Sequence, residues 1–441
     1  MRFIQIHHTE ELSRATSVQF IQKYRTKAGA FTRRRKLPLT SLLLTMLDRR
    51  GLTLSMELRR YRQKGILTEK ISKTAYLNQR KKLSPLAFLD MCQYRNRRLY
   101  DAGEMKSYKG YLLLAADGSS INIPTTNETL ELYGNASHKD KKPQASLGLS
   151  CLYDCINKTI LTGSINRARF SEPAQLENHL AELPSLVGDK PSIVMLDRGY
   201  PSTALFMRLN AKDQKYVIRL RSVDFKQEKS VMKSNDETVE ITFTKSRLNH
   251  YKGTDIYDQM IASGHLKLRI VKLALPCGGT EYLATNLRQE EFDTEEVSKL
   301  YTYRWGVETA FDTLKNKLNM ENFTGTSPIM IEQDIFASIY VCNLASDMIA
   351  DAEVKLQQRE ANRQSKRKHR MAINRSFAIG ILKDLLVAAI TAESKKKRER
   401  LFQQMIDETL DEVLPVRPGR RFKRSNGLLS ARFANSRKPT F

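Results

Sequence analysis

The sequence has few cysteines and no long apolar run. Its five cysteines are an odd number and show no C-x-x-C spacing, which argues against a disulfide framework and a zinc ribbon. The longest uninterrupted apolar runs, such as residues 111–116, fall far short of the roughly 20 residues that a membrane-spanning helix needs. The first residues, MRFIQIHHTEEL, contain no apolar signal segment. We therefore expect no membrane partner, no secretion, and a reducing compartment.

Two kinds of catalytic motif are also missing. The sequence contains no G-x-x-x-x-G-K-[ST] loop, so ATP use is not supported, and it shows no local signature of Ser-His-Asp chemistry. Cys151 and Cys155 are close enough in sequence to suggest a pair of metal ligands. They lie in a strand pattern that places both on one face, so packing explains them better.

Acidic residues are scarce relative to basic ones. The 441 residues include 74 Lys and Arg but 48 Asp and Glu, a formal net charge of +26. Residues 1–100 hold 23 basic and 6 acidic side chains, and residues 415–441 hold 8 basic and no acidic ones, so the excess lies at the two ends. Such a charge points to a polyanionic partner, most simply nucleic acid. The alternative is that the basic ends only keep the protein soluble.

The basic N-terminal part has the pattern of short helices. Leu43, Met46 and Leu47 recur at helical spacing after a proline, and Ser72 is a plausible N-cap for a following helix. Short basic helices of this kind are compatible with a helix-turn-helix unit, although any basic helical domain shares the pattern. Apolar content of 41% and the chain length predict a folded protein of two to four domains.

The middle of the chain alternates between strand and helix patterns. An apolar run that ends in Asp117 and is followed by Gly-Ser-Ser predicts a buried strand and then a turn. Another apolar run ends in Asp197. The remaining expected elements are strands at 144–155, 159–165, 216–220, 239–243, 268–273 and 281–285, and helices at 173–183, 201–210, 293–311, 331–350 and 374–413.

Three acids stand out by position. Asp117 and Asp197 each end a predicted strand, where side chains reach an open edge of a sheet, and Glu308 lies on the later helix. Each acid alone is better explained as an ordinary turn or surface residue.

The helix that carries Glu308 is more informative. At about 100° per residue, Tyr301, Arg304, Glu308 and Lys315 fall within about 60° on one face. This face is either a solvated stripe of mixed charge or a phosphate-handling surface. In the second case Glu holds a metal, Arg binds a phosphate in bidentate fashion and Lys binds another phosphate.

These residues resemble the signature of DDE transposases of the bacterial insertion-sequence family four. The pattern Tyr-x2-Arg-x3-Glu-x6-Lys over residues 301–315 is the specific part. The order of Asp-Gly-Ser at 117–119, Asp-Arg-Gly-Tyr at 197–200 and this helix is similar to the three motif blocks of that family. The gap from the second block to the helix is longer than the gap between the first two blocks, and it resembles the family's β-rich insertion. The resemblance covers nearly the whole chain.

The resemblance implies an α/β fold with a ribonuclease-H-like catalytic core. A β-rich insertion interrupts that core, an α-helical domain precedes it and a helical region follows it. The implied division is a basic DNA-binding domain at 1–105, core segments at 106–214 and 291–350, the insertion at 215–290, and a C-terminal region with a basic tail at 351–441.

The resemblance also implies a site. Asp117, Asp197 and Glu308 become catalytic ligands of two divalent ions, Mg²⁺ with Mn²⁺ as a substitute, and Asp117 bridges both. Arg304 and Lys315 hold phosphates of the terminal DNA and Tyr301 supports that contact. Arg198, Tyr200 and Trp305 are further expected DNA contacts. The alternatives that stay open are structural support for Arg198 and Tyr200 and core packing for Trp305.

The implied function is transposition of double-stranded DNA. The protein binds the terminal inverted repeats of its element, cuts both ends by two-metal hydrolysis, with a hairpin intermediate, and joins the 3′ hydroxyls to target DNA. A homodimer on DNA and a bacterial cytoplasmic, nucleoid-associated location are expected. Rival hypotheses are an inactive or domesticated copy that acts as a sequence-specific regulator, a nuclease or resolvase of the same fold class, and an RNA-binding protein.

Overall fold

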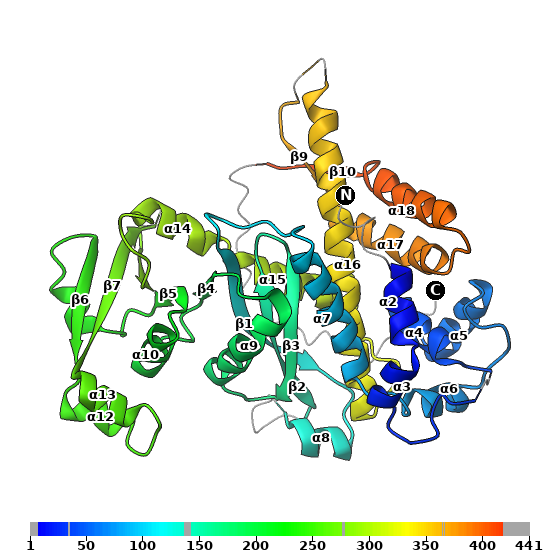
Figure 1. Ribbon diagram of the computed structural model, residues 1–441, viewed down its shortest axis with the longest axis horizontal. Coiled ribbons are helices and arrows are strands. Elements are labelled where there is room, and N and C mark those ends of the chain that lie inside the picture. Colours follow the sequence, from blue (N-terminus) through cyan, green and yellow to red (C-terminus); the bar gives the residue numbers. More distant parts are fainter. Residues whose placement is uncertain are drawn as a thin grey trace.

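The computed structural model describes residues 8–33, 36–135, 143–275, 278–363, 365 and 367–417. The chain begins with a group of helices, seen at the right of Figure 1: α2 (His8–Ala15), α3 (Val18–Tyr24), α4 (Leu39–Leu47), α5 (Leu54–Gln63), α6 (Lys73–Arg80) and α7 (Leu86–Asp101). Ser72 is the N-cap of α6, as predicted, because its side chain accepts a hydrogen bond from the Ala75 amide.

The elements that follow alternate strand and helix. The first part holds β1 (Leu112–Asn122), α8 (Asn127–Tyr133), β2 (Ser146–Asp154), β3 (Thr159–Arg167), α9 (Glu172–Val187), β4 (Ser192–Leu196), α10 (Thr203–Ala211) and β5 (Lys215–Leu220). Next come α11 (Lys226–Ser230), β6 (Asp236–Thr242), α12 (Lys245–Asn249), α13 (Tyr257–Ser263), β7 (His265–Ala274) and β8 (Thr280–Thr285). The chain then continues with α14 (Thr294–Thr302), α15 (Trp305–Asp312), the π-helix η1 (Thr313–Lys317), α16 (Pro328–Ala361), β9 (Met371–Ile373), α17 (Arg375–Ile390), α18 (Lys395–Thr409) and β10 (Val413–Pro415).

One eight-stranded sheet organises the middle of the molecule. Its strand order is β3-β2-β1-β4-β5-β8-β7-β6. Strands β1, β4 and β5 are parallel to one another, whereas β1, β2 and β3 are joined as antiparallel neighbours. The predicted mixed α/β class is therefore confirmed. The parallel pair β1–β4 requires a crossover connection, and the chain between them contains α9.

Helices cover both faces of this sheet. Successive residues of β1 point to opposite faces, so Leu113 and Ala115 pack in one hydrophobic core and Leu112 and Leu114 in another. The first core includes apolar side chains of α4, α7 and α16, and the second includes those of α9 and α10. In Figure 1, α7 and α16 lie side by side between the sheet and the other N-terminal helices.

Strand β1 is longer than predicted. Asp117 was expected to end it and Gly118 to begin a turn, but the strand continues to Asn122 and Gly118 pairs with Ser150 of β2. The turn prediction was wrong because this glycine serves close packing. A Cβ atom at position 118 would lie 2.6 Å from the Glu172 Oε1 atom and 2.9 Å from the Phe170 ring. A side chain at this position would force both neighbours to shift.

The segment 215–290 continues the same sheet. Strand β5 pairs in parallel with β4, and β8 pairs in antiparallel fashion with β5. Strands β7 and β6 extend the edge further. The strands expected in this segment are thus present. Strand β5 also lies at the start of the range predicted for the insertion.

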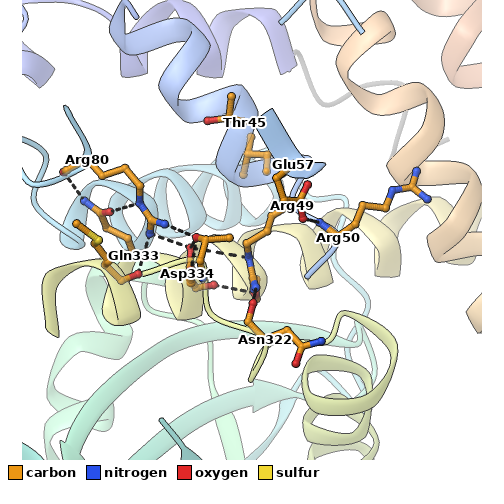
Figure 2. Close-up of polar contacts among 12 residues, drawn as sticks. Thr45, Arg49, Arg50, Glu57, Arg80, Asn322, Gln333 and Asp334 are labelled. Atoms are coloured by element: carbon orange, nitrogen blue, oxygen red, sulfur yellow. Dashed lines mark hydrogen bonds and ion pairs between the residues drawn. The ribbon is translucent and has the colours of Figure 1, made fainter. Parts of the chain in front are cut away.

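A buried polar network joins the N-terminal helices to α16. Figure 2 shows Arg80 and Arg49 converging on Asp334, whose side chain is fully buried. The Arg80 Nη2 atom donates to Asp334 Oδ1 at 2.8 Å, and Arg49 Nε lies 3.8 Å from the same oxygen. The Thr324 amide donates to Asp334 Oδ2 at 2.9 Å. Gln333 accepts from Arg80 Nε at 3.0 Å. These contacts connect residues 49 and 80 of the N-terminal region to residues 333 and 334 of α16.

Helix α16 is the core helix of the protein. Among the helices in the described ranges it alone is long and apolar enough to cross a membrane, and 94% of its most apolar window is buried inside the protein. A search for uninterrupted apolar runs does not find this helix, because α16 carries polar residues such as Asn343 and Asp347, both fully buried.

Two of the predicted long helices are interrupted. The segment after Asp293 forms α14, a turn at Tyr303 and Arg304, then α15 and η1. Asp293 does cap α14, since its side chain accepts from the Glu296 amide. The segment 374–413 forms α17 and α18, separated near Ser394, which caps α18. The expected basic tail lies, from residue 418 onward, outside the part of the chain that the structure describes.

Candidate active site

Asp117 lies within β1 on the face that packs toward α15. Its Oδ1 atom accepts a hydrogen bond from the Gly118 amide at 2.8 Å. Burial, the largest cause, together with the neighbouring carboxylates of Glu172 and Glu308, raises the pKa of Asp117 to about 6, against the opposing effects of that amide and of Arg304. The raised pKa indicates a carboxylate in a site with too little compensating positive charge.

Asp197 directly follows β4, the parallel neighbour of β1. The register pairs Leu114 with Val194 and Ala115 with Met195. If this pairing continued for two more residues, Asp117 would lie opposite Asp197. The number of residues between the two acids therefore equals the register difference between the two adjacent strands. Because side chains alternate along a strand, both acids extend from the same face of the sheet.

Glu308 approaches this face from α15, which packs against β1. Its Oε1 atom accepts a hydrogen bond from Arg304 Nη2 at 2.9 Å, so the two form an ion pair at i,i+4 spacing. Glu308 is close enough to Asp117 to raise the pKa of that carboxyl. The structure therefore brings the three acids toward one another from three different elements.

The signature residues around Glu308 do not form a solvated stripe. Tyr301 is 5% exposed and Arg304 is 3% exposed. The Tyr301 hydroxyl donates to Asp197 Oδ1 at 3.2 Å. Lys315 Nζ donates to the Ser120 carbonyl of β1 at 2.7 Å. Because the helix is broken at 303–304 and becomes a π-helix at η1, the single narrow face predicted for a straight helix is not formed. Instead these side chains bridge the helical segments to the acid-bearing strands.

The three further residues expected to contact DNA lie in different environments. Arg198 is exposed just after Asp197. Tyr200 is 2% exposed, which favours the alternative of structural support. Trp305 is 49% exposed, so the alternative of core packing is wrong. Its ring lies 5.2 Å from the Arg304 guanidinium carbon. An exposed indole next to the acids is free to stack on a base.

Two residues of this site escaped the sequence analysis. Glu172 is the first residue of α9, and burial raises its pKa, with a further contribution from Asp197. Arg219 of β5 has its Nη1 atom 4.0 Å from Asp197 Oδ1 and also pairs with Glu281. Neither belongs to a recognisable motif. In the sequence, Glu172 is marked only by its place at the start of the helix after β3, and Arg219 only by its place in the strand after β4. Their proximity to the acids results from the folding of the sheet.

The donor set suits a hard divalent cation. Carboxylate oxygens are the ligands that Mg²⁺ and Mn²⁺ prefer. The hydroxyl of Tyr200 is buried beside these acids and makes no hydrogen bond. Buried hydroxyls nearly always have a partner, so a bound ligand could supply the one that this hydroxyl lacks. Within the described ranges no three His, Cys, Asp or Glu side chains are yet close enough to share one ion. Arg304 holds Glu308 and Tyr301 holds Asp197 in this arrangement.

The cysteines belong to the interior, as expected. Cys151 and Cys155 are buried and free, and burial raises the pKa of both thiols above the ordinary range. Cys92 and Cys342 are likewise buried and free. Packing therefore accounts for Cys151 and Cys155, and Cys277 lies outside the described residues.

Comparison with known proteins points to one family. The family model described as the transposase DDE domain matches residues 108–344, more than half of the chain and the segment that carries all three acids. A segment of 92 residues is 29% identical to InsL, assigned as the transposase of insertion sequence element IS186A of Escherichia coli (strain K12). It is equally similar to the transposase of insertion sequence element IS421 of Escherichia coli. That segment covers 21% of this chain and a quarter of the length of each relative.

Among solved structures, a piggyBac transposase in a synaptic complex with hairpin DNA aligns over 97% of this chain and 86% of that chain. The TM-score is 0.43 and the identity 12%, too low to establish a common fold. The match of the DDE domain to more than half of the residues does not depend on that alignment. This chain belongs to the family of transposases with a DDE domain.

Proposed function

We propose that the protein is the transposase of a bacterial insertion sequence of family four. It binds the terminal inverted repeats of its element, cuts both ends by phosphodiester hydrolysis with a hairpin intermediate, and joins the 3′ hydroxyls to target DNA. The observation that carries the proposal is the convergence of Asp117, Asp197 and Glu308. Two come from adjacent parallel strands in matching register and the third from a helix packed on the first strand.

The order β3-β2-β1-β4-β5 supports a ribonuclease-H-like core. Three antiparallel strands are followed by two parallel ones, and Asp117 lies in β1 while Asp197 directly follows β4. We propose that residues 106–220 and 291–350 form this core and that the insertion begins after Leu220, because β5 is a full member of the core sheet. Residues 1–105 and 351–441 are the proposed DNA-binding and C-terminal regions.

Asp117, Asp197 and Glu308 are the proposed ligands of two divalent ions, with Asp117 shared by both. Mg²⁺, or Mn²⁺ in its place, would activate the attacking oxygen and stabilise the leaving oxygen. Arg304 now neutralises Glu308 and Tyr301 hydrogen-bonds to Asp197. We infer that entry of a DNA phosphate draws Arg304 from Glu308 to the phosphate oxygens, where its planar guanidinium can bind two of them. The carboxylate is then free for a cation.

The surface around the acids suits DNA. Lys315 donates to the Ser120 carbonyl of β1, beside Asp117, Arg198 is exposed next to Asp197, and Trp305 is about half exposed. We propose that these three contact the terminal DNA, that Tyr301 positions Arg304, and that Tyr200 supports the loop from within. Since two element ends must be joined, we propose a homodimer on DNA, acting at the bacterial nucleoid in the cytoplasm.

Cleavage of a labelled duplex that carries one flanking inverted repeat tests this function. Wild type with Mg²⁺ should cut at the repeat end, whereas EDTA or Asp197→Ala should abolish cutting and leave binding within a few fold. A duplex with a scrambled repeat is the substrate control, because a junction nuclease would ignore the repeat. Specific binding without cutting, on paired as well as single ends, would favour an inactive copy that acts as a regulator.

Binding to the repeat should weaken steeply with salt. The net charge of +26 lies mainly in the terminal regions, and each Lys or Arg that neutralises a phosphate releases a counterion. For roughly six to ten phosphate contacts, affinity should fall by about 10³-fold to 10⁵-fold between 50 and 200 mM salt. Fluorescence anisotropy across this range measures the slope. A nearly salt-independent affinity would contradict a role of the basic regions in DNA binding.

A further inference from the structure

The carboxylate of Glu172 lies between the two aspartate motifs. A Cβ atom built on Gly118 would be 2.6 Å from Glu172 Oε1, and one built on Gly199 would be 3.5 Å from Glu172 Oε2. Gly118 directly follows Asp117, and Gly199 is two residues after Asp197. One oxygen of Glu172 therefore faces each motif. A Cβ at position 118 would crowd the carboxylate, whereas a Cβ at position 199 would be in ordinary van der Waals contact with it.

No cation of the described chain compensates this carboxylate. In the ranges that the structure covers, Glu172 takes part in no ion pair or side-chain hydrogen bond, although it is partly buried and its charge interacts with those of Asp117 and Asp197. Arg304, the buried guanidinium whose charge acts on Asp117, pairs with Glu308 instead. Carboxylates in a partly buried site repel one another unless a positive charge lies among them.

An independent observation comes from Tyr200. Its side chain is 2% exposed, its hydroxyl has no hydrogen-bond partner, and the charges that act on it include those of Glu172, Asp117 and Asp197. A buried hydroxyl without a partner is rare and costs free energy. A ligand that enters among the acids would supply the missing polar partner.

We propose that Glu172 is a fourth carboxylate of the divalent-cation site, with the Tyr200 hydroxyl as a hydrogen-bond donor inside it. The proposal rests on the proposed function, since it adds a ligand to the site of Asp117, Asp197 and Glu308. It assigns α9 a direct part in that site, so that each of the elements β1, β4, α9 and α15 brings one acid.

A helix-dipole role is the competing explanation. An acid in the first turn of a helix stabilises it, and α9 already has Ser171 as its cap. The two explanations predict opposite changes in the melting temperature of the Glu172→Gln protein. If Glu172 serves only the helix, Glu172→Gln lowers the melting temperature in EDTA. If it is an uncompensated member of the cation site, the same change removes repulsion and raises the melting temperature of the metal-free protein.

The test is Mn²⁺ binding by the full-length protein without DNA, followed by electron paramagnetic resonance of free Mn²⁺. We expect Glu172→Gln to lower Mn²⁺ affinity at least about 10-fold and Tyr200→Phe to lower it several-fold. Glu128→Gln is the matched control, because Glu128 is a first-turn glutamate of α8, exposed to solvent, and should bind as wild type. Thermal unfolding in EDTA and with Mn²⁺ accompanies each titration.

The outcomes separate this proposal from the function on which it rests. If Asp117→Asn lowers Mn²⁺ affinity but Glu172→Gln binds within two-fold of wild type, the fourth carboxylate is wrong and the three-acid site stands. If Asp117→Asn also binds as wild type, the cation site of the proposed function is wrong. If Glu172→Gln fails to fold, Glu172→Asp takes its place, for which reduced affinity is expected and wild-type affinity would overturn the proposal.

Discussion

Replacing Glu308 with Gln is expected to abolish DNA cleavage, with a fall in rate of at least about 10³-fold, while repeat binding stays within a few fold. The amide has the shape of the carboxylate and can still accept a hydrogen bond from Arg304, so the fold should be kept. It lacks the negative charge that a hard divalent cation requires. A 10³-fold loss corresponds to about 4 kcal/mol of transition-state stabilisation, within the range expected for electrostatic and metal-ion catalysis.

Single-turnover cleavage of a labelled repeat duplex measures this effect, and anisotropy measures binding on the same samples. Glu295→Gln is the matched control, because Glu295 is an acid on the preceding helix α14, away from the signature positions, and should cut at the wild-type rate. A Glu308→Gln protein that still cuts DNA at a comparable rate would remove Glu308 from the catalytic site. Loss of binding together with cutting would instead assign Glu308 to the DNA interface.

Replacing Asp334 with Ala is expected to destabilise the protein by about 3–5 kcal/mol. The substitution leaves Arg80, which is fully buried, without its carboxylate, and takes a partner from Arg49 and from the Thr324 amide. Breaking a buried ion pair by removing one partner costs this much because the remaining charge stays buried and uncompensated. The network of Figure 2 links α4–α6 to α16, so the loss should loosen the N-terminal helices from the core.

Chemical denaturation followed by far-UV circular dichroism and by the fluorescence of the single tryptophan measures this loss, and agreement of the two probes checks for a single transition. Glu353→Ala is the control on the same helix. Its ion pair with Lys158 lies on the surface and should contribute at most about 1 kcal/mol. The double change Arg80→Met with Asp334→Leu should cost less than Asp334→Ala, because Arg80 no longer leaves a buried charge without its partner. Equal losses for Asp334→Ala and Glu353→Ala would contradict a stabilising role of the network.

The site is built from residues that local rules find and residues that they miss. Asp117, Asp197 and Glu308 were predicted from strand ends and from a helix signature, and the structure has them in β1, directly after the adjacent strand β4, and on a helix packed against β1. The prediction of one straight helical face failed, because Tyr303 and Arg304 form a turn and residues 313–317 form a π-helix. A helical wheel assumes a uniform rotation per residue, which interruptions of this kind remove. The ion pair of Arg304 with Glu308 and the hydrogen bonds of Tyr301 and Lys315 form in this interrupted helical segment.

Gly118 shows how a correct local rule can mislead. Glycine after an acid is a frequent turn signal, yet here the strand continues through Gly118. The reason is a contact with two residues much later in the chain, Phe170 and Glu172. A sequence window of a few residues does not contain that contact. Tyr200 is a similar case, since its motif position suggested DNA contact and its burial is a result of packing among distant elements.

By itself, the sequence determined the order of strands and helices, the basic ends and the three acids, because periodicity, charge and spacing are local properties of the chain. It even held the register of β1 and β4, as the interval between the two aspartates. Only the tertiary structure decided that Glu172 and Tyr200 face those acids, that Trp305 is exposed, and that Asp334 anchors two arginines. Burial and contact between distant residues depend on how the elements pack, and packing is set by the whole chain at once.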